Sequence, residues 1–456
     1  MPVKLPSVSQ VVALLLAGAA QVGLAYFTPR TNFGQVLALF AVALLAYAWL
    51  LRTGLSWRWG VAAALALRLL WLPAQPALSD DVYRFRWDGL LAANGVNPFR
   101  FRPDELIADG ARAAIPDAAA RNRALPQLQQ LYRQLNSPHY YSVYPPVCQF
   151  VFGAAAAAFP ASETGFVVSL RLAILAAEAG TAWLLLSLMA AAGLPLNRAL
   201  AYLLHPLAIA ELTGNLHVEG LALCFLLLML WLLARRRWAN GAGALALAVA
   251  TKLLPLLVLP LLVRRLGWKQ FVAFAAVAAG TGLLMFSPFL SADLMAHIGN
   301  SLQLYFHRFE FNASVYYLAR AVGYWLTTYN QIAIIGPALA FLSGIVGLAL
   351  AWRERRPTLA TLPRALLFTL TAYFLLATIV HPWYLTLLMG LTSLTRFRFP
   401  LVWGGMAVLS YGAYRTTSYT ENLWLVALEY AVVLAVLGWE LAHPPTHRAA
   451  AFEESQ

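Results

Sequence analysis

The chain has 456 residues, of which 61% are hydrophobic and only 11% are charged, and this composition excludes an ordinary soluble domain. Apolar segments recur along its whole length, and many reach the roughly 20 residues that span a hydrocarbon core. The net charge of +13 comes from Arg and Lys in short clusters between these segments, which is typical of cytoplasmic loops and excludes a nucleic-acid partner. We therefore expect one membrane-embedded domain over residues 1–456.

The N-terminal third begins with three predicted spans, 8–27, 33–51 and 57–72. Counted from a cytoplasmic Lys4, they place residues 73–146 outside as the first large extracytoplasmic loop. The apolar stretch 147–159 follows this loop, but the alternation of sides leaves no room for a complete crossing. We expect a re-entrant or interfacial element there, opened by Pro145 and Pro146.

The middle of the chain is interpreted backwards from the basic cluster Arg235 to Arg237, which should be cytoplasmic. This assignment makes 165–191, 197–211 and 217–234 successive crossings. The next apolar run, 239–263, has basic clusters at both ends. It therefore predicts a hairpin of two short helices that turns near Lys252 and Pro255, with Lys252 on the outer side.

The predicted spans of the C-terminal part also alternate in direction across the membrane. A second extracytoplasmic loop is expected at 291–329 and a cytoplasmic tail at 442–456. The further spans are 271–290, 332–352, 362–380, 383–394, 399–414 and 422–441. The prediction is an all-α polytopic membrane protein with about 12–14 transmembrane helices and both termini in the cytoplasm.

Ionisable side chains in or beside the spans require a structural or functional explanation, because inserting one at the centre of a transmembrane helix costs about 2.5–3.5 kcal/mol. Glu178 and Arg171 lie two turns apart in one span and predict a structural ion pair. Most of the others fall on the predicted outer side, and one polar site between helices would account for them. They are Asp80, Asp81, Asp88, Glu211, His217, Glu219, Lys252, His307, Arg308, Glu310 and His381.

The first outer loop opens with acids alternating with aromatic and basic residues. If residues 80–91 are helical, Asp81, Arg84 and Asp88 share one face, and an ordinary salt-bridged interfacial helix is the alternative to a functional site. Farther along, residues 103–136 predict two short amphipathic helices in the interface plane, broken by Pro116 and Pro126.

Short motifs follow one another through the predicted outer segments. The first loop contains Asp80-Asp81-Val82-Tyr83, Asp88-Gly89 and Gly95-Val96-Asn97-Pro98-Phe99. Later come His205-Pro206, Gly214-Asn215 with Glu219, Lys252-Leu253-Leu254-Pro255, Phe309-Glu310-Phe311-Asn312 and His381-Pro382-Trp383-Tyr384. In their order and their residues they resemble the motifs of the GT-C superfamily of membrane glycosyltransferases, in its polyprenyl-phosphate-mannose-dependent mannosyltransferase branch. Position 205 is His where that branch usually has Asn, which leaves its role open.

The resemblance implies an inverting transfer in which a carboxylate removes the proton of the acceptor hydroxyl. Asp80 is the first choice for this base, because its spacing from Asp88 fits the family signature better than that of Asp81 does. Asp81 is the second candidate, and its alternative role is to orient the sugar or a cation. The acidic pair could bind a divalent cation, but such a pair alone does not specify one.

The leaving lipid phosphate needs positive or hydrogen-bond-donating groups at the membrane surface. Lys252 is the first candidate, followed by Arg308 and His381, although Lys252 could instead snorkel from a helix end. The full set of predicted substrate-binding residues is Asp88, Tyr83, Arg84, Glu219, Lys252, His307, Arg308, Glu310, His381 and Tyr384.

The predicted activity is transfer of a hexose, by resemblance mannose, from a polyprenyl-phosphate donor to a glycan, lipid or protein acceptor. No Gly-rich phosphate loop is present, which disfavours a nucleotide donor. The resemblance places the enzyme in a bacterial inner membrane. Two alternatives remain open: a transporter or flippase of a lipid-linked sugar, although the two halves show no matching order of Gly, Pro and charge, and a non-catalytic assembly subunit or glycan polymerase.

Overall fold

Apart from turns and loops, the secondary structure is helical in the part of the chain that the computed structural model describes. Within that part, a single parallel β-bridge between Phe311 and Ile379 is the only pairing of extended segments. The prediction of an all-α polytopic membrane protein is confirmed. The described residues are 5–110, 114–115, 117–307, 309–416 and 419–443.

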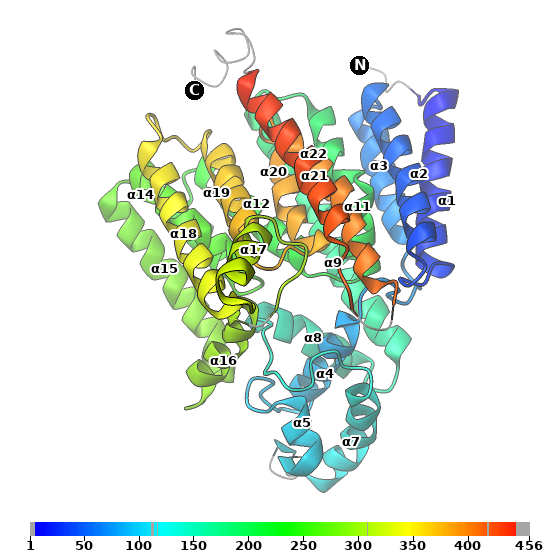
Figure 1. The fold of residues 1–456 in the computed structure, drawn as a ribbon, viewed down its shortest axis with the longest axis vertical. Coiled ribbons are helices and arrows are strands. Elements are labelled where there is room, and N and C mark those ends of the chain that lie inside the picture. The colour runs from blue at the N-terminus through cyan, green and yellow to red at the C-terminus, as the bar shows by residue number, and fades with distance from the viewer. Residues whose placement is uncertain (1–4, 111–113, 116, 308, 417–418, 444–456) are drawn as a thin grey trace.

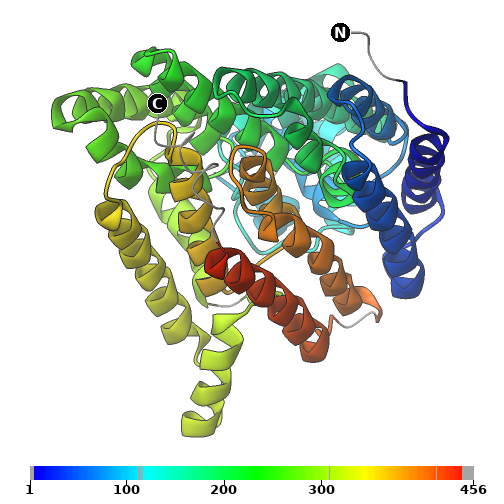
Figure 2. The same cartoon turned by 90° about the horizontal axis from the view of Figure 1, so that it is seen from above.

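Six of the described helices are long and apolar enough to cross a membrane, and a bent helix pair makes a seventh candidate. In Figure 2, α18 lies on one flank of the bundle and α1 on the opposite flank, with the orange and red C-terminal helices between them. The six are α1 (Val8–Tyr26), α2 (Phe33–Arg52), α9 (Glu163–Ala191), α15 (Trp268–Phe286), α18 (Ile332–Arg353) and α22 (Leu423–Ala442).

Shorter helices complete the bundle and the second outer segment. They occupy most of the remaining predicted spans, so the expected total of 12–14 crossings includes helices that are too short to span a bilayer alone. They are α3 (Trp57–Leu69), α10 (Leu200–Leu203), α11 (Pro206–Ala208), α12 (Glu219–Ala234), α13 (Trp238–Val249), α14 (Leu259–Leu266), α16 (Leu294–His307), α17 (Val315–Thr327), α19 (Leu362–Leu376), α20 (Thr386–Thr392) and α21 (Phe399–Met406).

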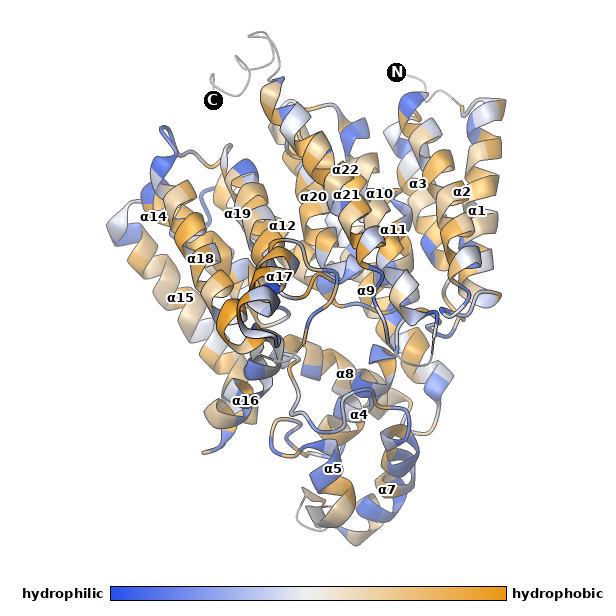
Figure 3. Cartoon of the chain, viewed as in Figure 1, coloured by the Kyte–Doolittle hydropathy of each residue, from blue (hydrophilic) through white to orange (hydrophobic). Residues whose placement is uncertain are grey.

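A lobe below the bundle is formed by α4 (Asp81–Ala93), α5 (Pro103–Glu105), α7 (Ala118–Tyr132) and α8 (Pro146–Ala158). Figure 3 shows mixed polarity in α5 and α7, in contrast to the apolar helices of the bundle. The 13 residues of α8 are too few to cross a bilayer. α8 packs on α4 at Gly89, where a Cβ atom would lie only 2.5 Å from the carbonyl oxygen of Phe152.

One detail of the predicted lobe is wrong. Pro126 does not break a helix, because α7 continues through it. A proline inside a helix removes one hydrogen bond and crowds the preceding turn. The burial of Leu128 and Leu131 on the same helix compensates for that loss. Pro116 lies outside the described residues.

The end of the bundle that is remote from the lobe carries the start of α1, the end of α22 and the connection between α18 and α19 (Figure 1). Two basic clusters of the sequence, Arg264 with Arg265 and Arg353 to Arg356, meet at this connection. The Arg265 guanidinium lies 2.5 Å from the Glu354 carboxylate, and Arg264 donates to the carbonyl oxygen of Trp352 at 2.9 Å. Clusters far apart in sequence thus share one end of the bundle, as the charge pattern predicts.

Candidate active site

A cavity of about 1040 Å³ lies where the lobe meets the bundle. Its wall combines the connection between α1 and α2, the start of α4, the loop before α8, the turns before α12 and after α13, and parts of α18 and α19. The volume is at the upper end of small-molecule pockets, which usually hold about 300–1,000 Å³. Predicted site residues that line it are Asp80, Asp81, Arg84, Glu219, Lys252, His381 and Tyr384.

The two neighbouring acids differ in their surroundings. Asp80 forms an ion pair with Arg30, and the Arg30 guanidinium also lies 5.0 Å from the ring centre of Tyr414. The Asp81 carboxylate instead faces His217, with 4.0 Å between Oδ2 and Nδ1. Burial raises the pKa of Asp81 above its ordinary value of 3.8, while the charges of His217 and Lys252 oppose that rise. Only Asp80 is therefore neutralised by a direct ion pair with an arginine.

A sharply broken helix supplies the centre of the site. Pro206–Gly214 and Glu219–Ala234 meet at an angle of 111°, and the break carries His217 and Glu219 into the cavity. Leu216 within the break has a φ of +66°, a left-handed conformation that is rare for residues other than glycine and costs on the order of 1–3 kcal/mol. The broken backbone is thus held in a strained form beside the acids.

Arg171 fixes this break from within α9. Its guanidinium donates to the carbonyl oxygens of Thr213 at 2.7 Å and Gly214 at 2.9 Å. It also reaches the carbonyls of Leu72 and Ala74, which lead into the first outer loop. The predicted pair of Arg171 with Glu178 is wrong, because Glu178 binds Arg68 at 2.7 Å. The two residues are seven positions apart on α9, about 10 Å along the helix axis, whereas Arg171 lies directly beside carbonyl groups at the end of the broken helix.

Replacing Arg171 by Met should destabilise the protein by about 3 kcal/mol, because buried carbonyls lose their donor. The thermal unfolding midpoint in detergent, followed by tryptophan fluorescence, should fall by several degrees. Leu172→Met is the matched control, since the neighbouring Leu172 is 51% exposed on the same helix. Equal midpoints for the two variants would show that Arg171 does not hold the break.

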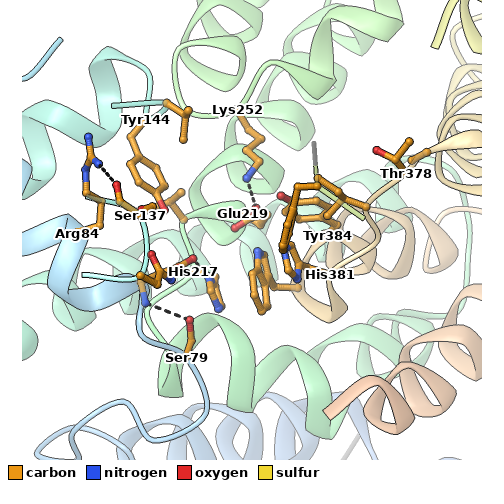
Figure 4. A pocket seen from close by; sticks show the side chains of 18 of the residues that line it. Ser79, Arg84, Ser137, Tyr144, His217, Glu219, Lys252, Thr378, His381 and Tyr384 are labelled. Atoms are coloured by element: carbon orange, nitrogen blue, oxygen red, sulfur yellow. Dashed lines mark hydrogen bonds and ion pairs between the residues drawn. The ribbon is translucent and has the colours of Figure 1, made fainter. Parts of the chain in front are cut away.

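Lys252 and Glu219 form an ion pair inside the cavity, with 2.7 Å between Nζ and Oε1 (Figure 4). Glu219 is buried at the start of α12, and Lys252 follows the end of α13, as the predicted hairpin turn requires. The ammonium group also lies 4.5 Å from the ring centre of Tyr384. The carboxylate and the ring hold the lysine head group in one place.

Trp383 stacks between two histidines. Its ring lies 3.8 Å from His217 and 4.3 Å from His381, nearly parallel to both. The segment is anchored by the β-bridge, in which the amide of Val380 donates to the carbonyl of Phe311 at 2.8 Å. Burial, with His217 and Lys252 nearby, holds the pKa of His381 well below its ordinary value of 6.5. His381 is therefore a neutral hydrogen-bonding group.

Several predicted site residues lie away from the cavity wall. Asp88 is fully buried, 3.0 Å from Arg84 and 3.1 Å from Gln149, and the half-buried Tyr83 does not line the cavity. Glu310 pairs with Arg320. Arg308 lies outside the described residues, and only the backbone position of His307 at the end of α16 is described. The structure thus supports a structural role for Asp88 and Glu310.

Arg84 lines the cavity but has structural partners. Besides Asp88, its guanidinium binds the carbonyl oxygen of Tyr140 at 3.0 Å and that of Ser137 at 3.4 Å (Figure 4). The salt-bridged helix face expected from Asp81, Arg84 and Asp88 is therefore half formed. Arg84 and Asp88 pair, whereas Asp81 turns toward His217.

Other lining residues were absent from the predicted set. Arg30 could have been found from the sequence, since a cation in a short outer connection departs from the positive-inside pattern and needs a partner. His217 was visible as an ionisable residue on the outer side but lacked a signal that separates it from a packing histidine. Trp383, Tyr414 and Tyr419 carry no local signal beyond their aromatic character.

The described acids, histidines and cysteines show no group of three or more that is placed to hold a metal ion. The two acids that the sequence offers for a divalent cation also have separate partners, because Asp80 binds Arg30 while Asp81 faces His217. Any divalent ion would have to displace one of these contacts.

The N-terminal part of the chain matches a known protein family. Curated proteins gave no significant match. Residues 8–267, more than half of the chain, match the family model described as alpha-(1->6)-mannopyranosyltransferase, N-terminal domain. The matched region contains Asp80, Asp81, Glu219 and Lys252. The chain therefore belongs to the alpha-(1->6)-mannopyranosyltransferase family, whose activity is mannosyl transfer.

Proposed function

We propose that this mannosyltransferase takes mannose from a polyprenyl-phosphate donor and attaches it, with inversion, to a hydroxyl group of a glycan or lipid acceptor. One observation carries the proposal: Asp81 and the Lys252–Glu219 pair line the same cavity, and the wall beside Lys252 is apolar. A carboxylate, a cation and an apolar surface are what a proton acceptor, a leaving phosphate and a polyprenyl chain require.

Asp81 is the proposed general base in place of Asp80, which the sequence favoured. The Asp80 carboxylate is occupied by its ion pair with Arg30, whereas burial raises the pKa of Asp81 and makes it a better base. The acceptor oxygen forms a bond to the anomeric carbon as the bond to phosphate breaks. The hydroxyl proton goes to Asp81, and the bonding electrons leave with the phosphate.

Lys252 is the proposed partner of the phosphate. Its ammonium group stabilises the negative charge that develops as the phosphate leaves, and Glu219 and Tyr384 keep it positioned. His381 faces the same cavity, and its Nδ1 is buried with no hydrogen-bond partner among the described residues. As a neutral ring it can hydrogen-bond to a phosphate or sugar oxygen.

The polyprenyl chain is proposed to lie on the apolar part of the wall. Leu253 and Leu254 follow Lys252 directly, and α18 and α19 add Leu339, Ala340 and Leu376. The lipid phosphate can then sit at Lys252 while its first isoprene units contact these side chains.

Replacing Ala340 by Phe tests this assignment. The larger side chain should raise KM for a long-chain donor by roughly 10-fold, since overpacking costs about 1–3 kcal/mol. A short-chain mannosyl phosphate should be affected much less. Leu342→Phe is the control, because Leu342 lies on the same helix, is 42% exposed and does not line the cavity. Equal effects on both donors would place the lipid chain elsewhere.

The site is proposed to face the outer side of a bacterial inner membrane. The supporting observation is that basic clusters, the start of α1 and the end of α22 gather at the end of the bundle remote from the lobe. By the positive-inside pattern, that end is cytoplasmic and the cavity beside the lobe is extracytoplasmic. A lipid-linked donor suits this side, where nucleotide sugars are normally absent.

A further inference from the structure

His217 occupies an unusual place between two carboxylates. Its Nδ1 lies 4.0 Å from Oδ2 of Asp81, and its Nε2 lies 3.2 Å from Oε2 of Glu211. Glu211 is completely buried in the π-helical turn Ile209–Gly214, and the Asn215 side-chain amide donates to it at 3.1 Å. π-Helical turns occur frequently at functional sites. A buried carboxylate at one nitrogen of an imidazole helps to fix the orientation of the ring.

The stacked indole of Trp383 also holds the ring of His217 in place. The two rings are 3.8 Å apart and inclined by only 11°, so the nitrogen-bearing edges of His217 stay free for the carboxylates. The π face of an indole attracts a cation. His217 thus has a negative group at each nitrogen and an electron-rich ring against its face.

His381 provides an internal comparison, because it stacks on the opposite side of the same indole, 4.3 Å away. No carboxylate lies within ion-pair distance of His381 in the described part of the chain. Burial and neighbouring positive charges keep it neutral. The two histidines share one aromatic partner but differ in their electrostatic surroundings.

We propose that His217, held in place by Glu211, is a positioning residue that keeps the Asp81 carboxylate ionised and directed into the cavity. The inference rests on the proposed function of Asp81 as the base. Before transfer, the positive ring stabilises the ionised form of Asp81. After Asp81 has taken the acceptor proton, that proton leaves to water when the product departs.

Other charges around Asp81 do not replace His217. Lys252 is directed to Glu219 at 2.7 Å and Arg30 to Asp80, whereas His217 faces the Asp81 carboxylate directly. The groups that act on Asp81 electrostatically are His217, Lys252, Glu219 and Asp80. His217 is the largest of the stabilising charges among them.

The test is the pH dependence of kcat/KM for transfer by the full-length enzyme in lipid nanodiscs. Activity needs ionised Asp81, so it falls as the pH drops through the pKa of that group. His217→Gln removes a nearby positive charge, which should raise that pKa and move the acidic limb upward by about one pH unit.

His381→Gln is the matched control for loss of a stacked ring. It should change the rate without moving the acidic limb, since the ring it removes is neutral. If His217→Gln lowers the rate but leaves the limb where it is in the wild type, His217 is only a packing residue and the inference is wrong.

A second measurement is independent of transfer. The protonation of Asp81 can be followed by ¹³C NMR of aspartate-labelled protein, with Asp81→Asn to assign the signal. Asp81 should titrate at higher pH in His217→Gln than in the wild type, and an unchanged titration would overturn the inference. If the wild type transfers no mannose, the proposed function fails, and this titration still decides the relation of His217 to Asp81.

Discussion

Replacing Asp81 by Asn should lower kcat for mannosyl transfer by about 10²- to 10⁴-fold, the usual contribution of a general base. The amide is nearly isosteric, so the cavity keeps its shape, but it cannot accept the hydroxyl proton. KM for the donor should change little, because Lys252 and the apolar wall are untouched. Initial rates with purified variants in nanodiscs measure both constants.

Asp80→Asn is the most informative comparison, because it changes the adjacent residue in the same way. This variant should lose roughly 10-fold or less, since it weakens only the Arg30 ion pair. The reverse order, with Asp80→Asn the more damaging change, would return the role of base to Asp80 and contradict the assignment made from the structure.

Replacing Lys252 by Ala should reduce kcat/KM by about 10²- to 10³-fold. The leaving phosphate loses the cation that stabilises its developing charge, and Glu219 is left as an uncompensated buried carboxylate. Lys252→Arg should recover part of the activity because it keeps the charge, although a guanidinium fits the site differently. The measurement is the rate at several donor concentrations.

Lys269→Ala serves as the control for loss of a lysine, since Lys269 is exposed at the start of α15 and does not line the cavity. It should behave like the wild type. If Lys252→Ala also retains wild-type kcat/KM, Lys252 does not meet the phosphate, and the donor must bind in another part of the cavity.

Much of the fold follows from patterns that are local in the sequence. The apolar segments predict most of the helices, and the basic clusters at 264–265 and 353–356 predict that these two connections share one end of the bundle, because lipid and membrane topology act on each segment separately. The resemblance to the mannosyltransferase branch is confirmed by the family match. The short motifs with Asp81 and Lys252 do reach one cavity.

Side-chain pairing could not be predicted in the same way. Arg171 has a possible carboxylate partner on its own helix but binds backbone carbonyls of other segments, and Glu178 binds Arg68 from α3. Arg30 meets Asp80 across 50 residues of sequence. Such pairs depend on how helices pack in three dimensions, and composition and spacing do not encode that arrangement.

The most direct test of the central proposal compares two donors. Purified protein in nanodiscs is given an acceptor-containing membrane fraction and radiolabelled mannose. The mannose is carried either by polyprenyl phosphate or by a nucleoside diphosphate. We expect label to reach the acceptor from the lipid-linked donor alone, and Asp81→Asn to slow this transfer by about 100-fold or more. Transfer from the nucleotide sugar alone, or movement of intact lipid-linked mannose across the bilayer without transfer, would contradict the account.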